Sequence, residues 1–500
     1  MKNALIHFYI FSLISTLFLG ICFTSADFLT IPVEMGKDLL VIAFQWAVVT
    51  IALFFLITLL AANKYIFAIT FPLLTFLSSL LAWFRLTMNS ALTPMILDAA
   101  LENDIRTSGD LCSPGLIIFV LVTFALSIAF AIYRIKRIVT QTFVIPACVS
   151  ALLLVGMLQI NAVKPISERI PFNIYYTFMK YWEEKQVISE DRTDLTEGIQ
   201  CSDEEVTVVF VLGESLRPDH LGLNGYERNT TPLLAKEEVI SFPYVYTEQT
   251  YTNRSVPHLL TRADSTDYSR AYTEKSFVSF FNACDFYTVW LANQEAADTY
   301  VYFMNECDSL FHVNIDKSSY VFDRWVDGDL LPLFDKALQV DNRKKMILLH
   351  TIGSHWWYNS HFTDEFARYQ PTVNSKIISS CTQEEMINSY DNTVLYTDYF
   401  LHSLIDRLRD KKAILIYQSD HGEALGEEGV WLHAAESAYT HQAACMVWMS
   451  DKYKELYPEK YEKAKENSVK RFRTDYLFHS ILDAAGIGSE YLNNSLSIFR

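Results

Sequence analysis

Long apolar runs fill the first 160 residues, and they restrict the fold of this chain more than any other feature. Each run is close to the roughly 20 residues that an α-helix needs to cross a bilayer. Five of them follow one another, at about residues 4–26, 39–62, 65–84, 115–133 and 142–160. One such run would fit a buried helix or a signal peptide, whereas five in succession predict a multi-pass membrane domain. The first run is long and more spans follow it, so we expect an uncleaved helix.

Charges in the short loops predict how this domain is oriented. Lys64 lies between the second and third runs, and Arg134, Lys136 and Arg137 lie between the fourth and fifth. Short loops rich in Lys and Arg face the cytoplasm, so the N-terminus should also lie on the cytoplasmic side. Five spans from there place everything after residue 160 outside the cytoplasm. The loop of residues 85–114 should also lie outside, and its acidic residues are Asp98, Glu102, Asp104 and Asp110.

The remainder of the chain is acidic. Residues 1–160 carry 8 Lys+Arg and 7 Asp+Glu, which leaves 33 basic and 51 acidic side chains for the rest. This balance excludes the basic surface of a nucleic-acid-binding protein, so we expect no nucleic acid as a partner. We predict three parts: a five-span transmembrane domain at 1–160, an interfacial helix and linker at 161–204, and an extracytoplasmic α/β domain at 205–500.

Aromatic residues are concentrated directly after the last apolar run. The segment "KPISERIPFNIYYTFMKYWEEKQ" mixes charges with Phe172, Tyr175, Tyr176, Phe178, Tyr181 and Trp182. Rings with an apolar body and a polar tip suit the boundary between membrane and water. We therefore expect a helix that lies on the outer leaflet, with a helix packed on the α/β domain as the alternative.

From residue 205 onwards, short β-branched and apolar runs alternate with amphipathic helical stretches. Such alternation predicts a mostly parallel sheet covered by helices on both faces. The clearest helical stretch covers Gln383–Leu408. The predicted strands are Val206–Leu212, Tyr287–Leu291, Met346–His350 and Ala413–Tyr417.

Three of these strands lead into side chains that bind metals. Glu214 and Ser215 follow the first strand, and His355 follows the third. Asp420 and His421 follow the fourth, and His433 comes twelve residues after His421. Functional groups gather at the carboxyl ends of strands in open α/β sheets, and carboxylate with imidazole is the usual ligand set for zinc. Manganese accepts the same groups, so the pattern predicts a zinc or manganese site.

Five motifs carry a resemblance to a known family: "VLGESLRPDHLGLNGYERNTTPLLAK", "TYTNRSVPHLL", "LHTIGSHWWY", "SYDNTVLYTDYF" and "SDHGEALGEEGVWLH". They resemble the membrane-bound phosphoethanolamine transferases of Gram-negative bacteria, in the alkaline phosphatase/sulfatase superfamily, and the resemblance covers essentially the whole chain. It implies an inner-membrane enzyme with its α/β domain in the periplasm. It also implies phosphatidylethanolamine as donor, and lipid A or another envelope glycan as acceptor. A cationic amine added to an anionic lipid would weaken its attraction for cationic peptides.

The resemblance also implies roles for individual residues. One zinc ion would be tightly held by Glu214, Asp420, His421 and the nucleophile Thr252, and a phospho-threonine would form on Thr252. His355 and His433 would contact the substrate phosphate or a second metal ion, and either one would serve as general acid. Ser215 and Ser255 are competing nucleophiles, although Ser215 is expected to cap a helix.

Other residues of these motifs receive structural interpretations. We expect Glu423, Glu427 and Glu428 on a helix or loop surface. Asp219 and His220 should support the first loop, and Tyr390, Asp391 and Asn392 should pack near the site. Asn253 and Arg254 are candidates for substrate contact from an exposed loop.

The cysteines depart from the family pattern. The positions that flank the nucleophile, where the family carries cysteines, hold Glu248 and His258. Cys307 and Cys381 match family cysteines, but the partner positions are Thr299 and Val373. At most two disulfides can form among the five cysteines after residue 160. Apart from the cysteines, the alternative function is a phosphoglycerol transferase or sulfatase-like hydrolase on the same scaffold, and an inactive protein that kept the fold is a more distant one.

Overall fold

The computed structural model describes residues 2–29, 36–88, 92, 96–97, 101, 112–159, 166–167, 169–185, 191–294, 297, 299–314, 324–375 and 378–500. It separates the chain into two compact units, Met1–Glu183 and Glu184–Arg500. The four acidic side chains of the predicted outer loop, at positions 98, 102, 104 and 110, lie outside the described residues.

The first unit is helical. Its helices are α1 (Lys2–Leu19), α2 (Ala26–Leu29), α3 (Gly36–Ala61), α4 (Lys64–Met88), α7 (Pro114–Arg137), α8 (Val144–Gln159) and α9 (Phe172–Lys185), with a π-helical turn at Gly20–Thr24. Within the described residues, four stretches are long and apolar enough to cross a membrane: Asn3–Leu29, Ile42–Ala61, Lys64–Met88 and Pro114–Arg137. This part of the chain therefore has the character of a membrane domain.

The fifth predicted span corresponds to α8, which is apolar but has only 16 residues. At 1.5 Å per residue this helix rises about 24 Å, less than the roughly 30 Å of a hydrocarbon core. The structure therefore confirms four of the predicted membrane helices by length and composition. A fifth span at 142–160 stays a prediction.

Arg134 has an internal role that its place in a positive loop did not indicate. Its guanidinium is buried and donates hydrogen bonds to the carbonyl oxygens of Ala61 (2.8 Å) and Ala62 (3.3 Å), beside the end of α3. It also donates to those of Ile138 (3.0 Å) and Thr140 (3.1 Å), which follow α7. The last carbonyls of a helix have no intrahelical donor, and Arg134 satisfies them.

The helix α9 has an uneven distribution of aromatic residues around its axis. Tyr175, Phe178 and Trp182 are 64%, 51% and 56% exposed, whereas Asn173 and Thr177 are buried. Exposed rings on one helix are what an interfacial helix requires. Its position on the outer leaflet stays a prediction.

The second unit contains a seven-stranded sheet within the described residues, in the order β2-β10-β7-β1-β6-β4-β5. All neighbouring strands pair in parallel except that β10 is antiparallel to both β2 and β7. The mostly parallel sheet is thus confirmed. Its strands are β1 (Thr207–Gly213), β2 (Ile240–Phe242), β4 (Tyr287–Ala292), β5 (Ser309–His312), β6 (Lys345–His350), β7 (Ala413–Ser419) and β10 (Cys445–Met449).

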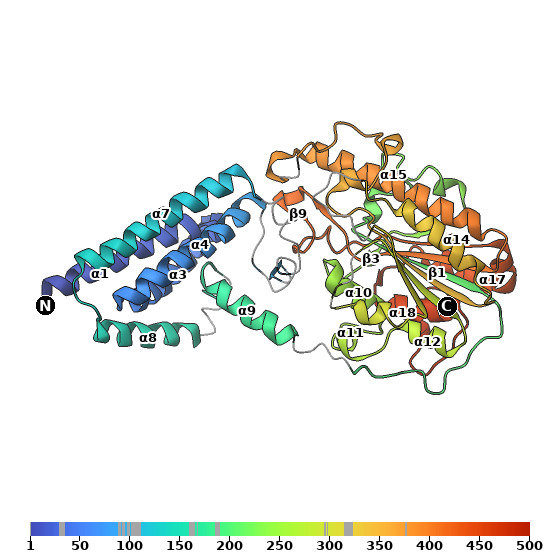
Figure 1. Cartoon of the computed structure of the whole chain (residues 1–500), viewed down its shortest axis with the longest axis horizontal. Helices are drawn as coiled ribbons and strands as arrows, with labels where there is room; N and C mark the ends of the chain where they lie inside the picture. Colours follow the sequence, from blue (N-terminus) through green and yellow to red (C-terminus); the bar gives the residue numbers. More distant parts are fainter. Residues whose placement is uncertain are drawn as a thin grey trace. The chain divides into compact units, whose positions relative to one another are not determined.

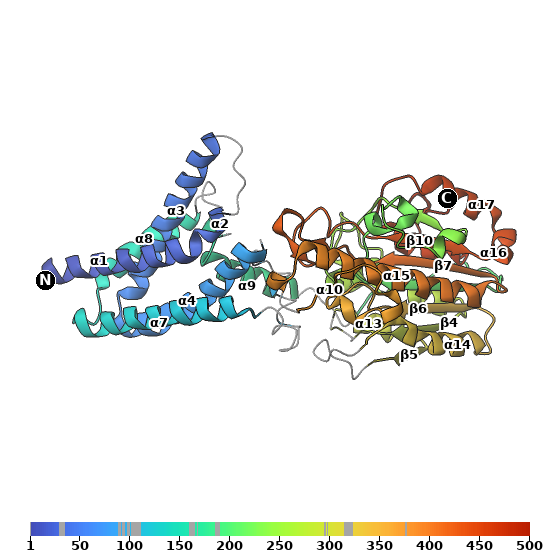
Figure 2. The same cartoon turned by 90° about the horizontal axis from the view of Figure 1, so that it is seen from above.

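Helices cover both faces of this sheet, as Figures 1 and 2 show. One face carries α10 (Thr252–Leu260), α12 (Phe277–Ala283) and α18 (Tyr476–Ala484), and the other carries α14 (Leu331–Gln339) and α15. The helix α15 covers Gln383–Leu408 as predicted, and a capping box between Thr382 and Glu385 fixes its start. The shorter elements are α11 (Arg270–Thr273), α13 (Val301–Met304), α16 (Asp451–Leu456), α17 (Pro458–Asn467), β3 (Val245–Tyr246), β8 (Ala424–Leu425), β9 (Trp431–Leu432) and β11 (Phe472–Arg473).

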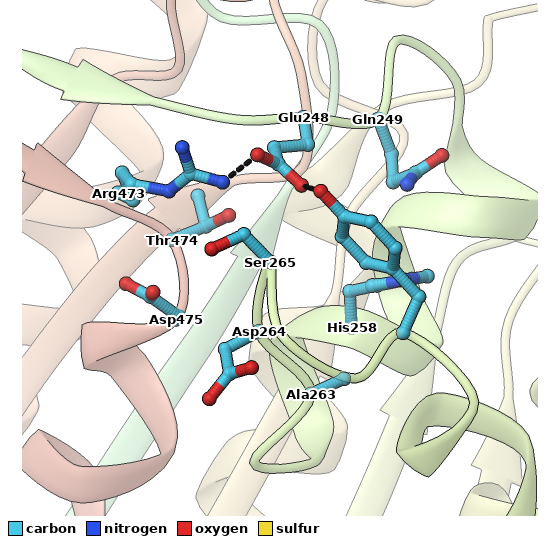
Figure 3. Close-up of a pocket in the computed structure, with 10 residues that line it drawn as sticks. Glu248, Gln249, His258, Ala263, Asp264, Ser265, Arg473, Thr474 and Asp475 are labelled. Atoms are coloured by element: carbon cyan, nitrogen blue, oxygen red, sulfur yellow. Dashed lines mark hydrogen bonds and ion pairs between the residues drawn. The ribbon is translucent and has the colours of Figure 1, made fainter.

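Cys201 and Cys284 form a disulfide that ties the segment before β1 to the end of α12. The segment before the predicted nucleophile is held by other contacts (Figure 3). The Glu248 carboxylate pairs with Arg473 and accepts a hydrogen bond from the Tyr268 hydroxyl. The His258 ring lies beside that of Tyr268, with centroids 5.8 Å apart. Polar and aromatic contacts therefore occupy the two positions where the family resemblance implied cysteines.

Replacing Arg134 by alanine should leave up to three carbonyl groups without a donor, because the Phe143 amide also donates to the Ala62 carbonyl oxygen at 2.9 Å. We expect the variant to lose about 1–3 kcal/mol of unfolding free energy, the usual cost of unsatisfied buried polar groups. Thermal unfolding of the full chain in detergent would show this as a lower Tm. Lys136→Ala is the matched control, since Lys136 is exposed on the same helix. Equal Tm values for the two variants would contradict the capping role.

Candidate active site at the carboxyl edge of the sheet

Two adjacent parallel strands bring the predicted carboxylates together. β1 pairs with β7 in a register that sets Gly213 opposite Ser419, the last residue of each strand. Glu214 and Asp420 come next in the chain, so both leave the sheet at the same edge. The Ser215 amide donates to Asp420 Oδ1 at 3.1 Å, and this links the two strand ends directly.

Thr252 reaches the same point from another element. It is the first residue of α10, and its hydroxyl donates to Glu214 Oε2 at 2.8 Å. The Thr252 hydroxyl oxygen also lies 3.4 Å from His421 Nε2. The N-terminus of a helix favours negative charge, because its first amides have no intrahelical acceptor. The hydroxyl is therefore held where an anionic group would be stabilised.

The acceptor atoms around this hydroxyl outnumber the donors. His421 Nδ1 lies 2.8 Å from the Gly422 carbonyl oxygen, which can only accept, so this nitrogen carries the ring proton. Nε2 therefore presents a lone pair, 3.2 Å from Asp420 Oδ2 and 3.4 Å from Glu214 Oε1. Asp420 Oδ2 is buried and has no hydrogen-bond donor among the described residues.

This donor set fits a cation. Glu214, His421 and His433 each offer one ligand atom, and the three atoms lie within 4.8 Å of one another. The orphaned Asp420 Oδ2 lies against the same group, and buried polar atoms in native proteins normally have a partner. Carboxylate and imidazole ligands of this kind match zinc.

The pKa values reflect the same crowding. Burial and the charge of Glu214 raise the pKa of Asp420 well above its usual range. Burial would raise the pKa of Glu214 too, but His421, His355, His433 and Gln294 hold it below its usual value. Burial lowers the pKa of His421 to about 4. The cluster therefore stabilises the ionised carboxylate of Glu214, whereas repulsion opposes the ionisation of Asp420 beside it.

His355 and His433 lie together beside His421, as the strand-end pattern predicted. The centroid of the His433 ring is 4.9 Å from that of His421 and 5.4 Å from that of His355. His433 Nδ1 donates to Glu423 Oε2 at 2.9 Å, and His355 Nδ1 lies against the Trp356 carbonyl oxygen. Both rings are thus oriented through Nδ1. Burial lowers the pKa of His355, whereas the Glu423 carboxylate overcomes burial and raises that of His433.

The surface role expected for Glu423 is wrong. Its side chain is fully buried and accepts hydrogen bonds from His433, Tyr358 (2.8 Å) and Ser215 (3.4 Å). The reason is a hairpin, in which β8 pairs with β9 and folds the chain back over the site. Nothing in the local pattern indicates this reversal except the glycines around Glu427.

The remaining glutamates of the motif differ from one another. Glu427 is half-buried, and its carboxylate pairs with Arg217 at 2.6 Å. The surface position that we expected for Glu427 is therefore only partly correct. Glu428 is exposed, as predicted.

Other side chains support the cluster from behind. Gln294, which the sequence analysis missed, donates to Glu214 Oε2 (2.9 Å) and to the Thr351 carbonyl oxygen (2.7 Å). The Tyr390 hydroxyl donates to the Ser215 carbonyl oxygen at 2.7 Å. His220 contacts Asp391 at 2.7 Å, and this contact ties the first loop to α15.

The competing hydroxyls are positioned differently from Thr252. Ser215 does not cap a helix; its φ of +57° turns the chain, and its hydroxyl donates to Glu214 Oε1 at 2.7 Å. Ser255 is buried in α10 and donates to the Gln249 carbonyl oxygen at 3.2 Å. Asn253 and Arg254 also lie in α10, not in the exposed loop that was expected.

The arrangement of a helix-terminal hydroxyl, two buried carboxylates and histidines at the carboxyl edge of a parallel sheet defines a class. It is that of α/β enzymes whose hydroxyl nucleophile works beside a metal ion. The sulfatase family matches residues 206–487, more than half of the chain, and the chain belongs to this family.

Relatives and solved structures extend the similarity. The chain is 36% identical over 263 residues to the Kdo(2)-lipid A phosphoethanolamine 7''-transferase of Escherichia coli, covering 50% of this chain and 46% of that protein. It is 30% identical over 310 residues to phosphoethanolamine transferase EptA of Salmonella typhimurium, covering 58% and 55%. The aligned part thus spans about half the length of these relatives. The integral membrane lipooligosaccharide phosphoethanolamine transferase A of Neisseria meningitidis shares the fold, with a TM-score of 0.81 at 24% identity, covering 98% of this chain and 97% of that one.

Truncation of Glu423 should disturb the site through its neighbours. Glu423→Ala removes the acceptor of both His433 Nδ1 and the Tyr358 hydroxyl, and we expect it to cost about 1–3 kcal/mol of unfolding free energy. Glu428→Ala, five residues along the same hairpin, should stay within about 0.5 kcal/mol of wild type, as exposed positions do. Thermal unfolding of the two variants tests this, and a Glu423→Ala protein as stable as Glu428→Ala would contradict it.

Proposed function

We propose that this chain is a zinc-dependent phosphoethanolamine transferase of the bacterial inner membrane, with the α/β unit in the periplasm. It would move phosphoethanolamine from phosphatidylethanolamine to lipid A or another envelope glycan. The observation that carries the proposal is the Thr252 hydroxyl, 2.8 Å from Glu214 Oε2 inside the buried cluster with Asp420 and His421. The names of the two relatives support the same reaction.

The residues of the cluster would hold the metal. Glu214, Asp420, His421 and Thr252 would hold the tightly bound zinc ion, which would give the orphaned Asp420 Oδ2 a partner. His433 lies within reach of the same ion, because its ligand atom falls within 4.8 Å of those of Glu214 and His421. A second ion near His355 and His433 is the further possibility that the family resemblance implies. A bound zinc ion supplies a lowered pKa for a coordinated hydroxyl and offsets charge on phosphoryl oxygens.

The side chains account for the order of bond changes. Glu214 orients the Thr252 oxygen by accepting its hydrogen bond. As the bond from this oxygen to phosphorus forms, the hydroxyl proton passes to Glu214, which accepts its hydrogen bond. At the same time the bond from phosphorus to the glycerol oxygen breaks, and the departing oxygen takes a proton from His355 or His433. In the second step an acceptor oxygen attacks the same phosphorus and gives its proton to that histidine, while Thr252 leaves with its oxygen and takes back the proton from Glu214. Proton transfer by a positioned histidine typically contributes 10²–10⁴-fold.

Mass spectrometry tests the nucleophile and the donor together. After the purified full chain is incubated with zinc and phosphatidylethanolamine but no acceptor, a phosphoethanolamine adduct should appear on Thr252. Thr252→Ala should carry no adduct. Ser255→Ala is the matched control on the same helix and should retain it.

The same experiment separates the alternative reactions. An adduct from phosphatidylglycerol but not from phosphatidylethanolamine would replace the proposal by a phosphoglycerol transferase. Absence of any adduct in protein with bound metal would favour a sulfatase-like hydrolase. An adduct on Ser215 would keep the reaction and overturn the assigned nucleophile.

Asp420→Asn tests the metal site with a readout apart from activity. In metal-free wild type the raised pKa of Asp420 means that ionisation at neutral pH opposes folding, so stability falls as pH rises from the ordinary carboxyl pKa toward the folded one. The asparagine keeps the acceptor at Oδ1, and its amide can donate to His421 Nε2. Metal-free Asp420→Asn should therefore equal or exceed metal-free wild type in Tm at pH 7, yet gain no stability from added zinc. A Tm increase with zinc as large as that of wild type would contradict the assignment.

A further inference from the structure

A pocket opens in the α/β unit, and its lining residues are outside the catalytic cluster. It has a volume of about 450 Å³ and is lined by Thr363, Asp364, Glu365, Phe366, Tyr396 and Tyr399. We propose that this pocket, which we call the aromatic–acidic pocket, binds an organic ammonium group, carried by a lipid headgroup or by a free amine. Its volume falls in the range of about 300–1,000 Å³ that is typical of small-molecule sites.

Three aromatic rings form one side of this pocket. Phe366 comes from a short 3₁₀ turn, Asp364–Phe366, and the two tyrosines come from successive turns of α15. Their ring centroids lie 5.0 Å (Phe366–Tyr396), 5.2 Å (Phe366–Tyr399) and 5.6 Å (Tyr396–Tyr399) apart. Phe366 and Tyr399 are half-buried, so both reach the pocket. Aromatic faces attract ammonium groups through their quadrupole.

Packing behind the rings holds them in place. Tyr396 is buried with Val326 and Phe362, and Phe366 and Tyr399 pack against this group. A cluster fixed in this way loses little freedom when a ligand binds, and this lowers the cost of binding.

The charges around the rings favour a cation. Asp364 and Glu365 are both exposed, and Asp364 pairs with Arg324. Among the residues that the structure describes, Glu365 has no ion-pair partner, so the pocket keeps an uncompensated carboxylate. Burial raises the pKa of Tyr396, and the nearby carboxylates of Asp327 and Asp329 raise it further. The ring of Tyr396 therefore lies in the negative field of these two carboxylates. An anion would be repelled here, and an ammonium group would be attracted.

The pocket shares no lining residue with the proposed active site. Within the described part of the chain, none of its lining residues makes a hydrogen bond or ion pair with Glu214, Thr252, Asp420 or His421. Thr393 of α15 donates to Ser354, next to His355, and Tyr399 is six residues further, about 9 Å along the helix axis. The aromatic–acidic pocket thus shares a rigid helix with the catalytic edge, and its assignment does not depend on the proposed reaction.

Choline and its uncharged carbon isostere, dimethylbutanol, provide a matched pair of probes. Titration of each into the full chain in maltoside micelles, followed by saturation-transfer NMR, should show binding of choline and much weaker binding of the isostere. Tyr399→Leu and Glu365→Gln should each weaken choline binding by roughly 2- to 5-fold, the value of one exposed cation–π or charge contact. Tyr399→Phe should retain the wild-type affinity because it keeps the ring. Glu490→Gln, an exposed carboxylate elsewhere on the unit, is the control.

The result can also identify the source of the ammonium group. Choline binding can be compared in nanodiscs of phosphatidylethanolamine and in nanodiscs of phosphatidylglycerol. Loss of choline binding in the first lipid but not in the second would assign the pocket to a lipid headgroup. Equal binding in the two lipids would assign it to a free amine. Equal binding of choline and the isostere, or wild-type choline affinity in both Tyr399→Leu and Glu365→Gln, would overturn the proposal. Because Glu365 is exposed, its substitution tests the idea even if Tyr399→Leu fails to fold.

Discussion

The closeness of two buried carboxylates, Glu214 and Asp420, is the main electrostatic constraint on the catalytic edge of the α/β unit. Parallel pairing of β1 with β7 forces both groups out at the same edge of the sheet. Removing two like charges from water is costly unless donors or a cation compensate them. The amides of Ser215 and His421 both donate to Asp420 Oδ1, which leaves the second oxygen to face the cluster. The sheet thus creates an electrostatic demand that a positive ion at this point would satisfy.

Backbone geometry around the carboxylates is adapted to this arrangement. Gly353 has a φ of +46°, and a Cβ at this position would lie 2.8 Å from the Glu214 carbonyl oxygen. The chain after β6 can therefore lie flat against Glu214, and the Ser354 amide donates to that carbonyl oxygen at 3.0 Å. This close approach brings His355 to the cluster. Only glycine permits both the contact and the conformation.

Features that depend on local pattern were predictable from the sequence. The strands β1, β4, β6 and β7 follow from apolar runs, and the helix α15 follows from its amphipathic pattern. Glu214, Asp420 and His421 follow from their places at strand ends. Features that depend on chain reversal or on distant partners were not. Glu423 is buried because a hairpin folds over it, and Ser215 turns the chain through a positive φ. Arg134 finds its carbonyls on two separate helix ends, and the pairing of Cys201 with Cys284 has no local signal.

The place of Thr252 at the start of α10 has a kinetic consequence. A phosphate ester on this residue would put its negative charge at the helix N-terminus, which is worth about 0.3–1 kcal/mol for a charged group. The helix would thus lower the free energy of the covalent adduct, and it would also lower the barrier to forming that adduct. An adduct held in this way would be lost to water more slowly, and its discharge would draw on the binding energy of the molecule that accepts the group.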